Sequence, residues 1–124
     1  MELTQFFKSI VDEERSAVVI CDINHTIIYM NPTAIERYGK RGGAELIGRN
    51  LLDCHNEKSS ELINQVLDWF KKDKENNRLF TYCNEKENKD VYMIALRDEQ
   101  GELIGYYEKH EYRNRETALA YKFD

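Results

Sequence analysis

Apolar residues recur at helical spacing near the start of the chain. They occupy positions i, i+3, i+4, i+7 and i+8, which lie on one face of a helix, so the pattern predicts an amphipathic helix over residues 2–14. The residues on this face are Leu3, Phe6, Phe7, Ile10 and Val11. A helix this short is marginal in water unless its apolar face is covered. The face therefore packs either against the domain's own sheet or against the same helix of a second subunit.

The pattern then changes to short runs of apolar, β-branched and aromatic residues, which are typical of strands. These runs cover residues 17–21, 25–30, 79–83, 91–96 and 103–110. The turn-like residues 22–24 join the first two runs into a hairpin. The polar segment 84–90 and the turn 98–101 separate the last three.

Helical segments occupy the middle of the chain. Asn31 is placed to cap a helix that has Pro32 at its first position, and the glycines that follow keep that helix short. A brief helical piece over 44–47 comes next. A longer helix then begins after the cap residue Asn56 and runs to about Lys72. Segregated strands and helices of this kind predict an α+β fold, with the helices on one face of a five-stranded antiparallel sheet.

Composition narrows the functional classes. A chain of 124 residues suits one domain, and its net charge of −5 is spread along the sequence, which argues against nucleic-acid and anionic-membrane partners. We expect a cytoplasmic protein, because no run approaches the roughly 20 apolar residues of a membrane span and the N-terminus does not resemble a secretory signal. The cysteines Cys21, Cys54 and Cys83 are odd in number and far apart, so we expect free thiols.

Four stretches, in order and at suitable spacing, resemble the Per-Arnt-Sim (PAS) domain over residues 2–112. They are Ala17-Val18-Val19-Ile20-Cys21-Asp22, Ile27-Ile28-Tyr29-Met30-Asn31-Pro32, Glu45-Leu46-Ile47-Gly48-Arg49-Asn50 and Gly101-Glu102-Leu103-Ile104-Gly105. The segment from Cys54-His55 to Lys58-Ser59 is similar to one in a poorly characterised bacterial subgroup of PAS domains. The resemblance implies a sensory module with an N-terminal helix (1–15), a PAS domain (16–112) and a C-terminal tail (113–124), the tail being either a frayed helix or disordered.

The resemblance also implies a cavity for a small apolar or aromatic ligand between sheet and helices. The residues expected to line it are Ile20, Ile35, Tyr38, Ile47, Leu51, Leu52, Cys54, His55, Val66, Phe80, Met93 and Tyr106. It favours a homodimer formed through the first helix, and signalling to a protein partner in trans. A dimerisation scaffold with a filled core and no ligand is an alternative.

Cofactor chemistry gives a further alternative. In light-oxygen-voltage domains a reactive cysteine follows a Gly-Arg-Asn stretch, but here Leu51 follows Asn50, which argues against a photoactive flavin adduct. His55 or Cys54 could serve a haem or thiol-redox sensor. Each also has a structural interpretation: His55 as a polar residue at the entry of the helix, and Cys54 as a small buried apolar side chain.

The histidines show no metal-ligand spacing. His25 is expected in the hairpin turn, and His110 is expected to face solvent at a strand end. No phosphate loop, catalytic triad order or acid pair is present, so we expect neither a metal site nor catalytic residues.

Overall fold

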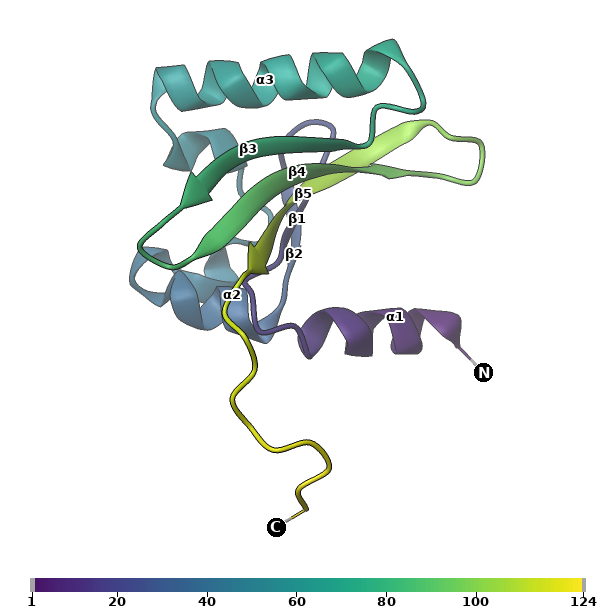
Figure 1. Ribbon diagram of the computed structural model, residues 1–124. Helices are drawn as coiled ribbons and strands as arrows, with labels where there is room; N and C mark the ends of the chain where they lie inside the picture. The colour runs from purple at the N-terminus through teal and green to yellow at the C-terminus, as the bar shows by residue number, and fades with distance from the viewer. Residues whose placement is uncertain (1, 124) are drawn as a thin grey trace.

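The computed structural model describes residues 2–123 and shows one five-stranded antiparallel sheet (Figure 1). The strand order across the sheet is β2-β1-β5-β4-β3. The strands are β1 (Val19–Asp22), β2 (Ile27–Met30), β3 (Arg78–Asn84), β4 (Lys89–Arg97) and β5 (Leu103–Tyr112). β5, the last strand in sequence, lies in the middle of the sheet and joins the N-terminal hairpin to the C-terminal one. The predicted α+β class is confirmed.

Six helical elements accompany the sheet. They are α1 (Leu3–Asp12), α2 (Pro32–Arg37), the 3₁₀ turns η1 (Gly39–Arg41), η2 (Gly43–Leu46) and η3 (Leu51–Cys54), and α3 (Glu57–Lys72). Side chains from α2, η2 and α3 pack with sheet residues in one core, so these elements cover a single face, the inner face. α1 lies apart, toward the opposite face (Figure 1).

Alternation along the strands assigns each side chain to a face. On β1, Cys21 is buried on the inner face, whereas its neighbour Ile20 pairs with Tyr107 on the outer face. On β4 and β5 the inner-face pairs include Met93 with Glu108. This register determines which strand side chains face the cavity.

Both predicted helix caps are confirmed. The Asn31 side chain accepts a hydrogen bond of 2.9 Å from the Ala34 N–H, and Asn56 accepts one of 2.8 Å from the Ser59 N–H. The two asparagines have nearly the same backbone angles, φ −74° with ψ 167° and 171°. They differ in surroundings, because Asn31 is fully buried and Asn56 is exposed.

Arg97 on β4 fastens the C-terminal end of α3 to the sheet. Its guanidinium donates to the carbonyl oxygens of Phe70 (2.7 Å), Asn76 (3.1 Å) and Asp73 (3.2 Å). It also donates to the carbonyl oxygen of Gly101 in the β4–β5 turn, at 3.0 Å. Carbonyls that a helix end leaves without partners are thus paired by one cation.

The structure corrects several element boundaries. The first helix ends at Asp12, short of the predicted residue 14. β4 begins at Lys89, inside the segment 84–90 that was predicted to be a connection, because β3 and β4 pair up to Asn84 and Lys89. Residues 113–123 form neither helix nor strand. Within the described residues, no helix has the length and apolar character needed to cross a membrane.

Candidate functional site: a cavity beneath the short helices

A cavity of about 200 Å³ lies between the inner face of the sheet and the covering helices. β1, β2, β4 and β5 form one wall, and η2, η3 and α3 form the other. The apolar lining consists of Ala17, Val19, Cys21, Ile27, Met30, Leu46, Leu51, Ile63 and Met93. The interior therefore suits an apolar or aromatic group.

A hydrogen-bonded chain of three side chains borders one side of the cavity. His25, in the β1–β2 turn as predicted, is buried; its Nδ1 lies 2.7 Å from the Tyr106 hydroxyl and its Nε2 lies 2.9 Å from Asn64 Oδ1. Because an amide oxygen only accepts, Nε2 carries the hydrogen and Nδ1 accepts from the Tyr106 hydroxyl. The Tyr106 hydroxyl also has the Cys21 thiol as a hydrogen-bonding neighbour.

Burial shifts the ionisation of two cavity-wall groups. It raises the pKa of Tyr106, with the neighbouring Cys21 as a smaller cause. It also raises the pKa of the Cys21 thiol to about 11. Both groups are therefore neutral at physiological pH, and neither supplies a nucleophile.

Polar side chains gather where the cavity opens to solvent. Arg41 from η1, Cys54 from η3, His55 just after it and Glu108 from β5 all line the cavity, and all are exposed. Tyr38 lies with them. Burial, and to a smaller degree the nearby Glu108 carboxylate, raises the pKa of its hydroxyl. We call the exposed Arg41, His55 and Glu108, together with the buried His110 beside Glu108, the rim.

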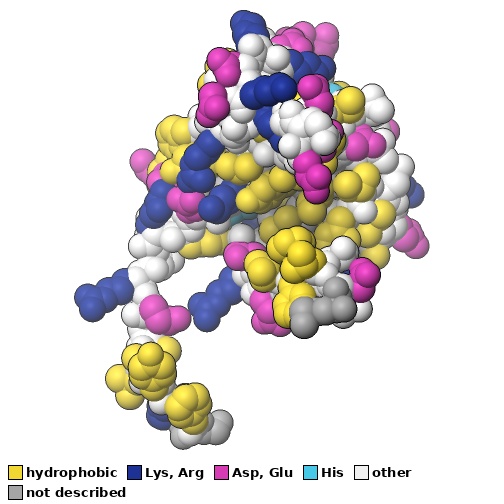
Figure 2. Space-filling view, turned by 90° about the vertical axis from the view of Figure 1, so that its right-hand side faces the viewer, with side chains coloured by type: hydrophobic (Ala, Val, Ile, Leu, Met, Phe, Trp, Pro, Cys, Tyr) yellow, Lys and Arg dark blue, Asp and Glu magenta, His cyan; other side chains and the backbone are white. Residues whose placement is uncertain are grey.

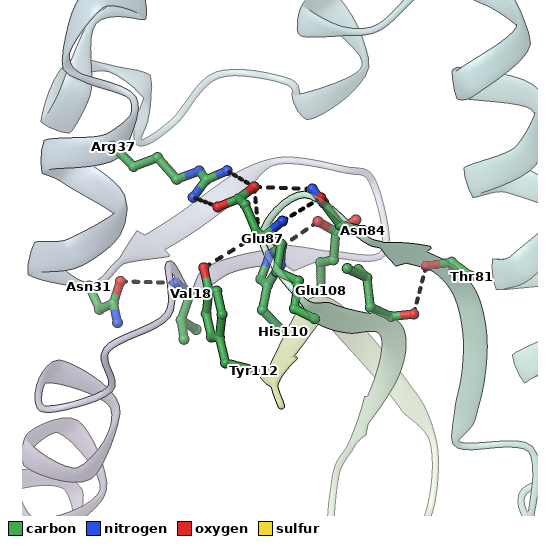
Figure 3. Close-up of polar contacts among 11 residues, drawn as sticks. Val18, Asn31, Arg37, Thr81, Asn84, Glu87, Glu108, His110 and Tyr112 are labelled. Atoms are coloured by element: carbon green, nitrogen blue, oxygen red, sulfur yellow. Dashed lines mark hydrogen bonds and ion pairs between the residues drawn. The ribbon is translucent and has the colours of Figure 1, made fainter. Parts of the chain in front are cut away.

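His110 contradicts the prediction that it faces solvent. Its side chain is only 7% exposed, because residues 106, 108 and 110 of β5 alternate onto the inner face. Its Nε2 lies 3.2 Å from Glu108 Oε1 (Figure 3). Its buried Nδ1 has no hydrogen-bond partner among residues 2–123.

A second polar cluster ties α2 to the β3–β4 hairpin (Figure 3). Arg37 donates two hydrogen bonds of 3.3 Å to the Glu87 carboxylate, and this pairing lowers the pKa of Glu87. The Lys89 ammonium, whose side chain is 1% exposed, lies 3.4 Å from Glu87 and 3.4 Å from the Tyr112 hydroxyl. The charges in this cluster are paired, so it has a structural role.

The structure brings half of the predicted cavity residues together. Those that line the cavity are Tyr38, Leu51, Cys54, His55, Met93 and Tyr106. Ile35 and Val66 instead pack against the core without reaching the cavity, and Leu52 is half-buried outside it. The structural interpretation of Cys54 as a small buried side chain is wrong, since this thiol is exposed.

Three predicted cavity residues face other surfaces. Ile20 points to the outer face, where it pairs with Tyr107. Phe80 is 57% exposed and packs on Tyr92, also on the outer face. Ile47 follows the end of η2 and is 41% exposed. The predictions for Ile20 and Phe80 are wrong because they rest on apolar character alone, whereas the register of the strand decides which face a side chain lies on.

The apolar face of α1 is largely uncovered. Leu3, Phe6, Phe7 and Ile10 are each more than half exposed. Only Val11 turns inward, beside the outer-face residues of β1 and β5, so it belongs to the contact within the domain and not to the exposed face. Figure 2 shows hydrophobic side chains on α1 and, above it, a further hydrophobic area on the body of the domain.

An antiparallel sheet whose inner face is covered by short helices over a small cavity is the α+β arrangement typical of one family of domains. The chain belongs to the PAS domain family, which it matches over residues 15–108. PAS domains are sensory modules of signal-transduction proteins. No curated protein sequence matches the chain.

Solved PAS structures share this fold. The PAS domain of a protein from Colwellia psychrerythraea has a TM-score of 0.64 at 14% identity, covering 89% of this chain and 96% of that one. A sensory box sensor histidine kinase from Vibrio cholerae has a TM-score of 0.59 at 14% identity, covering 89% and 90%. The PAS domain of Bordetella pertussis BvgS has a TM-score of 0.57 at 15% identity, covering 91% and 88%.

Proposed function

We propose that this chain is a sensory module that binds a small ligand in its inner-face cavity and signals through the packing of a homodimer. The cavity carries the proposal: it is lined by apolar groups, reaches solvent at a polar rim, and touches β5 at the centre of the sheet. A signalling protein that recognises the dimer in trans would receive the output.

The size of the cavity limits the ligand. A cavity of about 150 Å³ is enough to hold benzene, and drug-sized ligands occupy roughly 300–1,000 Å³. At about 200 Å³, this cavity suits a molecule with one ring or a short branched chain. Haem and flavin are larger than that, so the residues present do not fit either group. His55 and Cys54, the residues of the haem or thiol-redox alternative, are both exposed at the cavity opening.

The second copy docks through α1 in this proposal. Covering an exposed Leu, Ile or Phe side chain stabilises an assembly by about 1.5–3 kcal/mol, and α1 presents four of them on one face. Three of the four are more than 55% exposed in the single chain, so the chain's own surface does not cover them. A second α1 is self-complementary to such a stripe, as a two-fold interface requires.

Sedimentation of charged α1 variants tests the dimer. The double variant Phe6→Glu, Phe7→Glu places two carboxylates in the apolar stripe and is expected to sediment as a monomer where the parent chain is a dimer. The matched control, Gln5→Glu with Ser9→Glu, adds the same charge on the opposite side of α1 and is expected to remain dimeric. An unchanged mass for the Phe6, Phe7 variant would refute docking through α1.

A further inference from the structure

The rim of the cavity carries one cationic and one anionic side chain, although the chain as a whole has a net charge of −5. Arg41 is permanently charged, and His55 and His110 are basic, whereas Glu108 is the one acidic side chain among the cavity-lining residues. An anion at this opening therefore meets a guanidinium without the excess of carboxylates that the chain as a whole carries.

Arg41 has no hydrogen-bonding or ion-pair partner among the residues that the structure describes. Its guanidinium makes no hydrogen bond or ion pair with residues 2–123, whereas the nearby Arg37 holds Glu87 with two hydrogen bonds. A guanidinium presents a planar fork of N–H donors that matches the two oxygens of a carboxylate. Arg41 is thus an available anion-binding group at the edge of an otherwise apolar cavity.

His110 gives an independent indication that this end of the cavity is incomplete. Its Nδ1 is buried in the cavity wall without a hydrogen-bond partner, among the residues that the structure describes. Buried polar atoms are almost always paired, and an orphan in a wall commonly marks a place that a ligand or an ordered water completes.

We propose that the cavity binds a small monocarboxylic acid, with its single ring or branched chain among the apolar wall residues and its carboxylate on Arg41. This inference rests on the proposed ligand-binding function and adds the chemical class. An amine is the competing choice, because Glu108 is also on the rim. Glu108 already lies beside His110 Nε2 at 3.2 Å, whereas Arg41 is unpaired, so the carboxylate is favoured.

Methyl NMR of the protein labelled with ¹³C-methyl methionine tests the proposal, because Met30 and Met93 both line the cavity. The probes are benzoate, phenylacetate and isovalerate, with benzyl alcohol and benzylamine as the neutral and cationic comparisons. We expect the three carboxylates to shift the Met30 and Met93 signals, and at least one to bind tenfold or more tightly than either comparison.

Arg41→Gln is expected to weaken that carboxylate at least tenfold. Lys40→Gln removes a neighbouring exposed cation that does not line the cavity, and is expected to leave the affinity unchanged. Equal losses of carboxylate affinity in the two variants would show that net charge alone causes the effect, and would overturn the role of Arg41.

The remaining outcomes separate the two proposals. Equal binding of benzoate and benzyl alcohol would overturn the carboxylate assignment while leaving a ligand-binding cavity. Tighter binding of benzylamine would also overturn it, and would identify Glu108 as the rim residue that binds the charged group of the ligand. Shifts from none of the five probes would overturn the carboxylate proposal and the ligand part of the proposed function, whereas the α1 dimer would still stand on its sedimentation result.

Discussion

Replacing Asn31 by alanine is expected to destabilise the fold far more than the loss of a helix cap does. The Asn31 side chain is fully buried and makes four hydrogen bonds. Its oxygen accepts from the N–H groups of Val18 and Ala34, both at 2.9 Å, and its Nδ2 donates to the carbonyl oxygens of Val11 (3.0 Å) and Ser16 (3.1 Å). One side chain therefore joins the end of α1, the start of β1 and the start of α2.

The magnitude follows from these four contacts. Losing a cap costs about 1 kcal/mol, and each further hydrogen bond contributes about 0.5–1.5 kcal/mol. A buried backbone group left unpaired, such as the Val18 N–H, costs about 1–3 kcal/mol. We expect Asn31→Ala to lower the free energy of unfolding by about 3–5 kcal/mol, out of a total of about 5–15 kcal/mol for a domain of this kind.

Asn56→Ala is the matched control, because Asn56 caps α3 with the same backbone geometry but is exposed and makes only the cap bond. It is expected to cost about 1 kcal/mol. Asn31→Asp keeps both acceptor positions but places a buried carboxylate oxygen against the carbonyl oxygens of Val11 and Ser16, so it should cost at least as much as Asn31→Ala. Urea unfolding followed by the fluorescence of Trp69, the only tryptophan, measures all three. Equal losses for Asn31→Ala and Asn56→Ala would refute the reasoning.

Two further predictions concern the sheet. Gly105→Ala would place a Cβ 2.2 Å from the Cys21 carbonyl oxygen, forcing β1 and β5 apart, so we expect a loss of about 3 kcal/mol or more in urea unfolding; Gly39→Ala, with open space around it, should change stability by less than about 0.5 kcal/mol. Hydrogen bonding to Arg78 lowers the pKa of Glu111 from 4.5 to about 2. The ionised Glu111 therefore stabilises the fold above about pH 4.5, and this contribution is lost as the pH falls toward 2. Glu111→Gln should flatten the dependence of the urea midpoint on pH in that interval, and an unchanged acid limb would contradict the assignment.

The element order could be read from the sequence because each signal is local. Asn31-Pro32 specifies a helix start through a cap and a proline with a fixed backbone angle, and the structure confirms the cap and the place of Pro32 at the start of α2. The α1 stripe is visible at helical spacing in the sequence itself. The length of β4 was not visible in this way, because its first two residues, Lys89 and Asp90, are charged and join the sheet only through pairing with β3 and β5.

The cavity lining was harder to predict because it depends on register, which is a property of strand pairs. Phe80 is as apolar as a cavity residue, but its partner Tyr92 faces outward. The rim residues Glu108 and His110 were missed for the opposite reason: their polarity suggested solvent. Tyr106 was correctly assigned to the cavity, and alternation from that residue alone would have placed residues 108 and 110 beside it.

The same alternation gives β5 a role in the proposed signalling. On its inner side Tyr106, Glu108 and His110 line the cavity, and on its outer side Tyr107 and Lys109 lie beside the end of α1. Consecutive residues of one strand thus contact the cavity and the C-terminal end of α1. Since a close-packed interior transmits strain, we expect a ligand that shifts the inner side chains of β5 to shift the surface beside the end of α1 as well. No longer path through the core is needed to connect the two sites.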